Sequence, residues 1–187
     1  MDVTVQFQKA LLELARRVPV VSPGQWHDPT PCSEWDVHDL TNHIVNELRW
    51  VPPLLEGRTI EEVGDRLDGD LLGSDPVGAS QDAMRGAADA ATRPGVLERV
   101  VHLSFGDASG EEYLSQMTSD VTIHAWDLAR AIGADERLDP DLVTFVHDYL
   151  APQVEQWRAA GAFGEPVEVA DDADPQDKLL AMLGRRP

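Results

Sequence analysis

Apolar residues recur at helical spacing along most of this 187-residue chain, and proline or glycine interrupts the pattern at intervals. Between Val3 and Val18 the apolar residues fall on one face of a helix. The same spacing returns after each break and predicts further helices over 37–50, 76–91, 111–132 and 140–160. Helices with one apolar stripe bury it by packing against each other. The pattern therefore predicts a mainly α fold, an antiparallel helical bundle with long connections.

The segments between these helices predict little regular structure. Residues 56–76 are polar and rich in glycine, so we expect mostly connection there, and Pro52-Pro53 should end or kink the second helix. Residues 96–105 form the best strand candidate, and 167–169 could also be extended. A short terminal helix is expected from Asp174-Pro175 to Leu183. We expect residues 1–187 to form a single helical-bundle domain with a short C-terminal tail.

The charge of the chain excludes several classes of partner. Acidic residues number 34 against 15 basic ones, so the net charge is -19. Such a surface repels nucleic-acid phosphates and anionic lipid headgroups, and no uncharged run is long enough to span a bilayer. The single cysteine, Cys32, cannot form an internal disulfide, and the first residues lack a signal-peptide pattern. We expect a cytoplasmic protein without nucleic-acid or membrane partners, and a homodimer is compatible with the sequence.

One segment of the fourth predicted helix carries two potential metal ligands. Asp120 and His124 are four residues apart, which places their Cβ atoms about 5–6 Å apart on one helix face. Asp127 follows on the same face, beside apolar residues that suit burial. A carboxylate and an imidazole in this arrangement can bind one metal ion. A local Asp–His hydrogen bond, or a polar stripe facing solvent, would explain the same spacing.

A second histidine, His43, lies in the second predicted helix with an acidic residue four positions away on each side. These residues, Asp39 and Glu47, share a helix face with His43. Either carboxylate could accept a hydrogen bond from the second ring nitrogen of His43, and Glu47 could be a ligand itself. Taken alone, a solvated acidic helix face with one histidine on it explains this pattern better. Cys32 has no basic or metal-motif neighbour and is interpreted as a small buried residue in a turn.

Two stretches together resemble a known protein family. Residues 30–44, TPCSEWDVHDLTNHI, resemble the PCxxWxVxDLxxH segment of actinobacterial DinB-like metal-binding proteins. These proteins are related to the N-terminal domain of mycothiol-dependent maleylpyruvate isomerase. Residues 120–133, DVTIHAWDLARAIG, resemble the HxWDLAxAxG signature of the same group. Residues 166–169 and 174–181 are also similar, so the resemblance covers almost the whole chain.

The resemblance implies a DinB-like four-helix bundle with a metal site in its core. The ligands of the family are a histidine from the second helix and a carboxylate-x-x-x-His pair from a later helix, which correspond here to His43, Asp120 and His124. The carboxylate of the isomerase is Glu, so Asp120 is one methylene shorter. Two imidazoles and one carboxylate leave an open coordination position, which is typical of catalytic zinc sites. The carboxylates expected to support the ligands are Asp39, Glu47 and Asp127.

The same resemblance implies a chemistry. The expected ion is divalent, zinc in the first place, with nickel or iron as alternatives. A bound low-molecular-weight thiol such as mycothiol would attack a small electrophilic substrate, as in a transferase or isomerase. The open site could instead activate water for hydrolysis, or belong to a non-catalytic metal-binding or regulatory protein. No catalytic residue is assigned from the sequence, and the candidate cations for an anionic thiol conjugate are Arg49, Arg93 and Arg130.

Overall fold

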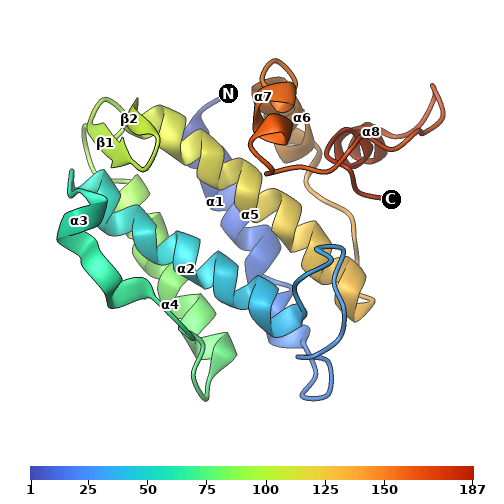
Figure 1. The fold of residues 1–187 in the computed structure, drawn as a ribbon, viewed down its shortest axis with the longest axis horizontal. Coiled ribbons are helices and arrows are strands. Elements are labelled where there is room, and N and C mark those ends of the chain that lie inside the picture. The colour runs from blue at the N-terminus through green and yellow to red at the C-terminus, as the bar shows by residue number, and fades with distance from the viewer.

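Four long helices form the body of the molecule in the computed structural model, which describes residues 1–187 (Figure 1). They are α1 (Val3–Ala15), α2 (Val37–Leu55), α4 (Pro76–Ala91) and α5 (Gly110–Ile132). Helix α2 packs against α4 and α5, and α1 packs against α5 and α4. This arrangement confirms the predicted mainly α fold and the four-helix bundle. No helix is both long and apolar enough to cross a membrane.

The remaining elements are short. Helix α3 (Ile60–Val63) and 3-10 turns at Val18–Val20 and Gly64–Leu67 lie in the connections. Strands β1 (Val100–Leu103) and β2 (Gly106–Ser109) form an antiparallel hairpin in which Leu103 pairs with Gly106. Three helices complete the chain: α6 (Pro140–Leu150), α7 (Val154–Ala159) and α8 (Pro175–Met182). They lie along one side of α5 (Figure 1, orange and red).

Local capping explains where helices α2 and α5, which carry the candidate site, begin, and where α5 ends. Helix α2 starts with a capping box, in which the Asp36 carboxylate accepts from the Asp39 N–H and the Asp39 carboxylate accepts from the Asp36 N–H. Helix α5 starts at Ser109, whose hydroxyl accepts from the Glu112 N–H. It ends at Gly133, which has φ of +68°, a conformation that glycine adopts without steric cost.

Two predicted helix boundaries are wrong. Helix α2 does not end at Pro52-Pro53 but continues to Leu55, and the Glu56 N–H still donates to the Pro52 carbonyl at 3.0 Å. Proline removes a donor but has a helix-compatible φ, and the buried Leu54 and Leu55 extend the apolar stripe beyond it. The predicted helix 140–160 is instead divided into α6 and α7 around a turn that contains Pro152.

Two expectations for extended segments meet different outcomes. The strand expected in 96–105 is present as β1, whereas its partner β2 has no β-rich sequence and was not expected. Residues 167–169 are not a strand, although the Val167 N–H donates to the Ala181 carbonyl at 2.9 Å. The terminal helix is confirmed as α8, with Asp174 as its N-cap.

The apolar core has two parts that meet at α5. The larger part, 29 buried residues, lies among α1, α2, α4 and one face of α5. The smaller part joins Ile123 and Trp126, on another face of α5, to apolar residues of α6 and α8. Because both parts include residues of α5, this helix is covered by the bundle on one side and by the C-terminal helices on another.

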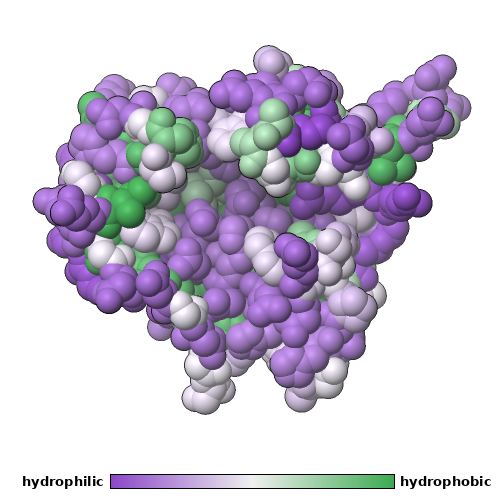
Figure 2. All heavy atoms as spheres, in the orientation of Figure 1, coloured by the Kyte–Doolittle hydropathy of each residue, from purple (hydrophilic) through white to green (hydrophobic).

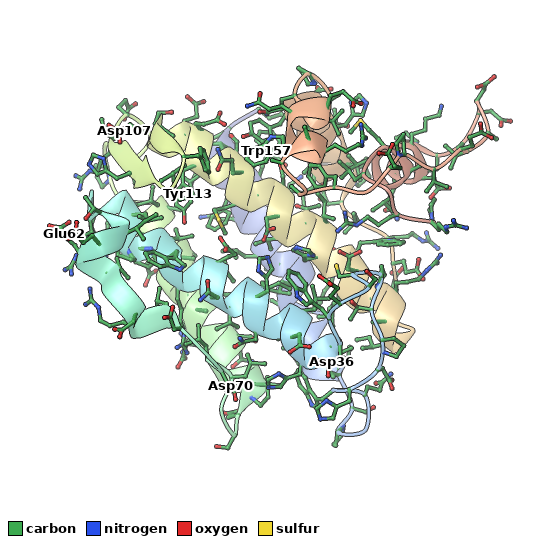
Figure 3. All side chains as sticks on the ribbon, viewed as in Figure 1. Asp36, Glu62, Asp70, Asp107, Tyr113 and Trp157 are labelled. Atoms are coloured by element: carbon green, nitrogen blue, oxygen red, sulfur yellow. The ribbon has the colours of Figure 1, made fainter.

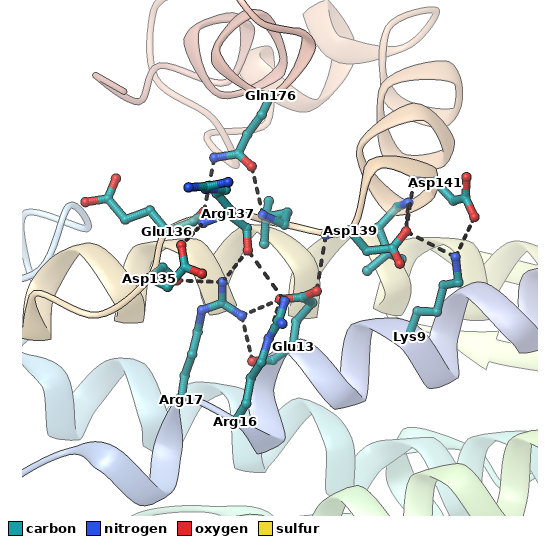
Figure 4. Close-up of polar contacts among 12 residues, drawn as sticks. Lys9, Glu13, Arg16, Arg17, Asp135, Glu136, Arg137, Asp139, Asp141 and Gln176 are labelled. Carbon is teal, nitrogen blue, oxygen red and sulfur yellow. Dashed lines mark hydrogen bonds and ion pairs between the residues drawn. The ribbon is translucent and has the colours of Figure 1, made fainter.

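A buried ion pair joins α1 to the segment between α5 and α6 (Figure 4). The Arg17 guanidinium contacts the Glu13 carboxylate, and these side chains are only 3% and 5% exposed. Arg17 also donates to the carbonyls of Asp135 and Arg137, at 2.9 Å each. Glu13 in turn accepts from the Asp139 N–H at 3.2 Å. Removing one charge of such a pair leaves the other buried without its partner.

We expect Glu13→Gln to lower the free energy of unfolding by about 3 kcal/mol, because the buried Arg17 loses its counter-charge. The matched control is Asp82→Asn, which breaks the Arg85–Asp82 pair of α4, where both side chains are 68% exposed. Urea denaturation followed by circular dichroism measures both variants. Equal losses of stability in the two variants would contradict the expectation.

Candidate metal centre

The structure brings the three predicted ligands together. His43 comes from α2, and Asp120 and His124 come from α5. The Asp120 Oδ1 lies 3.3 Å from the His124 Nε2 and 3.6 Å from the His43 Nε2. One side-chain nitrogen or oxygen from each of the three residues lies within 4.8 Å of the others. These atoms are close enough to contact a single cation.

A hydrogen bond on the far side of the His124 ring orients it toward this cluster. The His124 Nδ1 lies 3.0 Å from the Asp127 Oδ2, and the Asp127 side chain is completely buried. A carboxylate only accepts hydrogen bonds, so the Nδ1 beside Asp127 carries a proton, and Nε2, which faces Asp120, is the ring nitrogen that can give up its proton to bind a metal ion. This is the arrangement in which carboxylates support metal-binding histidines.

The Asp127 carboxylate is also held by a residue from the end of the chain. Arg185, which follows α8, places its Nη2 at 2.9 Å from the Asp127 Oδ2 and its Nε at 3.3 Å from the Asp127 Oδ1. Although burial raises the pKa of Asp127, contacts with His124 and Arg185 lower it below its usual range. The C-terminal segment therefore keeps the partner of His124 ionised and in place.

The charges of the cluster suit a divalent cation. Burial raises the pKa of Asp120, but the imidazoles of His124 and His43 outweigh this effect and hold the pKa well below its usual range. Burial lowers the pKa of His124, but Asp120 and Asp127 raise it well above its usual range. The second Asp120 oxygen, Oδ2, is buried and has no hydrogen-bond partner. An ion entering the cluster would satisfy this oxygen and displace the proton favoured on His124.

A cavity of about 470 Å³ opens beside the cluster, and 13 of its 21 lining residues are hydrophobic. His43, Asp120 and His124 line part of it, and Glu47 lines it as well. Burial, together with the negative charge of Asp120, raises the pKa of Glu47. The hydroxyl of Tyr113 is buried there without a partner. The molecular face in Figure 2 is hollowed between the hairpin side and the C-terminal helices, and Figure 3 shows Tyr113 near the hairpin.

Two residues in the loop before α2 contact the cluster. The sequence placed Trp35 in the core near the site, as a packing residue, and did not assign Cys32 to the site. The Trp35 ring lies 4.6 Å from the His43 ring, at an interplanar angle of 32°. The Cys32 Sγ lies 3.5 Å from the Asp127 Oδ2 and 4.0 Å from the His124 Nδ1. Cys32 lies in a turn, as expected, in which the Trp35 N–H donates to its carbonyl at 2.9 Å, but it is half-buried beside the cluster rather than fully buried. Both residues belong to the stretch 30–44 that resembles the family, and this is the sequence feature that could have indicated their place at the site.

Several other sequence candidates lie away from the cluster. Asp39 is exposed, and its carboxylate accepts from the Asp36 N–H in the helix cap, so the structure does not place it at His43. Arg49 donates to the Leu71 carbonyl at 3.4 Å, and the other two arginines pair with surface carboxylates. Arg185 is instead the arginine that reaches the cavity, and no local sequence pattern points to it.

The sequence over residues 7–129 matches the family model of the mycothiol maleylpyruvate isomerase N-terminal domain. The chain belongs to this family. The matched residues include the three clustered side chains and Asp127, whereas Arg185 lies beyond them. Two uncharacterized proteins of Mycobacterium tuberculosis, from strains CDC 1551 and H37Rv, are each 33% identical to this chain over 194 residues. The matches cover 99% of this chain and 98% of each relative.

A solved structure supports the same fold. The crystal structure of a histidine-to-alanine mutant of mycothiol-dependent maleylpyruvate isomerase superimposes with a TM-score of 0.66 at 15% sequence identity. The match covers 91% of this chain and 75% of that one. Because 91% of 187 residues extends well beyond residue 129, the shared fold includes more than the bundle that the family model describes.

We expect Asp127→Asn to weaken zinc binding by roughly 10–100-fold, because a neutral amide replaces the charged carboxylate that accepts from the His124 ring. Asp107→Asn is the matched control, since Asp107 accepts from the exposed His102 in the same way, at 2.7 Å. Competition with a chromophoric chelator measures the dissociation constants, and circular dichroism checks the fold. Unchanged zinc affinity in a folded Asp127→Asn protein would show that this hydrogen bond does not support a metal ligand.

Asp39→Ala provides a second comparison. We expect it to lower the free energy of unfolding by about 1 kcal/mol, because the Asp36 N–H loses its acceptor in the capping box, and to leave zinc affinity unchanged. If Asp39→Ala instead raised the zinc dissociation constant as much as Asp127→Asn, Asp39 would have to support a metal ligand.

Proposed function

We propose that this protein binds a divalent metal ion, zinc in the first place, through His43, Asp120 and His124. We further propose that it uses a low-molecular-weight thiol of the mycothiol type to act on a small electrophile, as a transferase or isomerase. The single observation that carries the proposal is the convergence of two imidazoles and one carboxylate at the wall of a mostly apolar cavity. The chain belongs to a family named for a mycothiol enzyme, which supports the choice of thiol.

The residues of the cluster have distinct tasks in this proposal. A divalent ion held by the three ligands supplies Lewis-acid chemistry, which lowers the pKa of a thiol bound beside it. Asp127 holds the proton on the His124 Nδ1 and so keeps the Nε2 lone pair directed at the ion site. Tyr113 offers an unpartnered hydroxyl to an acceptor atom on the substrate. The apolar lining of the cavity keeps water away from the sulfur.

The alternatives are tested by different observations. A non-catalytic metal-binding or regulatory protein would need no open space at the ion, and the cavity beside the cluster therefore favours an enzyme. A metal-dependent hydrolase would use the same ligands with water as the nucleophile. A hydrolase would not require a thiol, whereas the proposed transferase or isomerase would. A cytoplasmic location belongs to the proposal as well, because the cytosol keeps small thiols reduced.

We expect the purified protein to contain about one equivalent of a divalent metal and to consume electrophiles only when thiol is added. Metal analysis of the protein, followed by turnover assays with and without thiol over a panel of electrophiles, measures both. Turnover without thiol would favour the hydrolase. A protein that binds no divalent metal at micromolar concentration would refute the metal-dependent mechanism.

His124→Ala should abolish thiol-dependent turnover, because it removes one of the ligands. The matched control is His102→Ala, which removes a more exposed histidine that is likewise paired with an aspartate. We expect the control to keep full turnover. A His124→Ala protein that keeps full turnover on the same substrate would remove His124 from the mechanism.

Metal binding should also stabilise the fold without being required for it. If the ion binds only the folded state, it stabilises by about 2.7 kcal/mol at a hundredfold excess over its dissociation constant. The bundle has its own core of 29 buried residues, so chelation should lower the melting temperature and leave a helical protein. Thermal denaturation with zinc and with chelator measures the shift. Complete unfolding by chelator would indicate a structural ion instead.

A further inference from the structure

The cavity beside the candidate metal centre collects most of the aromatic side chains of the protein. The chain has five tryptophans, four phenylalanines and two tyrosines, and six of these residues line the cavity. They come from α2, the hairpin, α5, α6, α7 and the segment after α7: Trp50, Phe105, Tyr113, Tyr149, Trp157 and Phe163. Residues this far apart in sequence converge only through the fold, and they give the cavity flat, polarisable walls.

The cavity has no free arginine or lysine to receive an anionic group, and the imidazoles in its lining face the Asp120 carboxylate. Arg185 is the one arginine or lysine in its lining, and both its Nε and its Nη2 are directed at Asp127. Two further carboxylates, Asp120 and Glu47, face the cavity. A divalent ion at the cluster would therefore lie next to acidic groups that offset its charge. A ligand with a carboxylate would add buried negative charge without a partner, which is costly.

Two elements from different parts of the chain meet over the cavity through aromatic side chains. Phe105 lies in the turn of the hairpin and is 67% exposed, although it lines the cavity. The centroid of its ring lies 6.2 Å from that of Trp157 in α7, and the two rings are nearly perpendicular. Figure 3 shows Trp157 at α7, on the side that faces the hairpin. An apolar ligand beneath this pair would cover the exposed face of Phe105, and the removal of this apolar surface from water would favour binding.

From these observations we infer that the cavity takes a neutral aromatic electrophile, a substrate without carboxylate or phosphate groups, and that Phe105 and Trp157 hold its ring. This inference concerns the substrate class of the proposed site, and it rests on the proposed function for the statement that the bound molecule reacts. The volume of about 470 Å³ is that of a small-molecule pocket. Edge and face contacts with aromatic walls favour a ring over an aliphatic chain.

Two dyes with the same skeleton test the ligand class without requiring turnover. N-phenyl-1-naphthylamine is neutral, and 8-anilino-1-naphthalenesulfonate is the same molecule with one sulfonate. Each is titrated by its own fluorescence into the protein as purified, and again after zinc is added. We expect the neutral dye to bind at least about tenfold more tightly than the sulfonate in both conditions. Equal affinities, or tighter binding of the sulfonate, would overturn the inference.

Variants locate the binding and its charge preference. Phe105→Ala should weaken binding of the neutral dye by about tenfold, because the dye loses the ring surface that it would cover. The control Val20→Ala alters an exposed apolar residue that does not line the cavity, and should change nothing. Glu47→Gln should strengthen binding of the sulfonate dye several-fold and leave the affinity for the neutral dye unchanged. Binding of the neutral dye that is insensitive to Phe105→Ala would place it elsewhere and refute the proposed clamp.

The two proposals can fail independently. Selective binding of the neutral dye by a protein without metal or thiol-dependent turnover would refute the proposed function and keep the ligand class. Thiol-dependent turnover of carboxylate-bearing electrophiles, with no preference for the neutral dye, would refute the ligand class and keep the function.

Discussion

A buried carboxylate, that of Asp127, joins the candidate metal centre to the rest of the molecule. Its side chain is wholly inaccessible to water, and such a charge is tolerated only with good partners. It has His124 on one side and Arg185 on the other, with the Cys32 thiol also in contact. The orientation of His124 therefore depends on the last residues of the chain and on the loop before α2. The family-model match ends at residue 129, so part of this support lies outside it.

Helix packing supplies what the motif on α5 lacks. Asp120 and His124 share a face of one helix by their spacing, but two ligands leave a weak site. The packing of α2 against α5 adds His43 as the third, and Trp35 stacks on its ring. Because the ligands belong to two helices of a bundle with its own apolar core, the centre can be largely pre-formed before an ion binds.

The cavity and the cluster depend on different parts of the chain. The bundle provides the ligands, whereas the hairpin and α7 provide two aromatic residues of the cavity lining, Phe105 and Trp157. This division allows the ligands to remain the same while the substrate class changes with the surrounding loops and C-terminal helices. It agrees with the general observation that function resides in sites placed on a fold rather than in the fold itself.

The sequence alone determined the features that depend on neighbouring residues. The helices over 76–91 and 111–132 and the shared face of Asp120 and His124 all follow from the spacing of residues close together in the chain. The resemblance of two segments added the expectation that His43 joins them. The continuation of α2 through Pro52-Pro53 and the strand β2 did not follow, because burial and cross-strand pairing outweigh local preference there. Arg185, Cys32 and the aromatic cavity were decided only by the tertiary structure, since contacts between residues 58 to 95 positions apart leave no periodic trace in a single sequence.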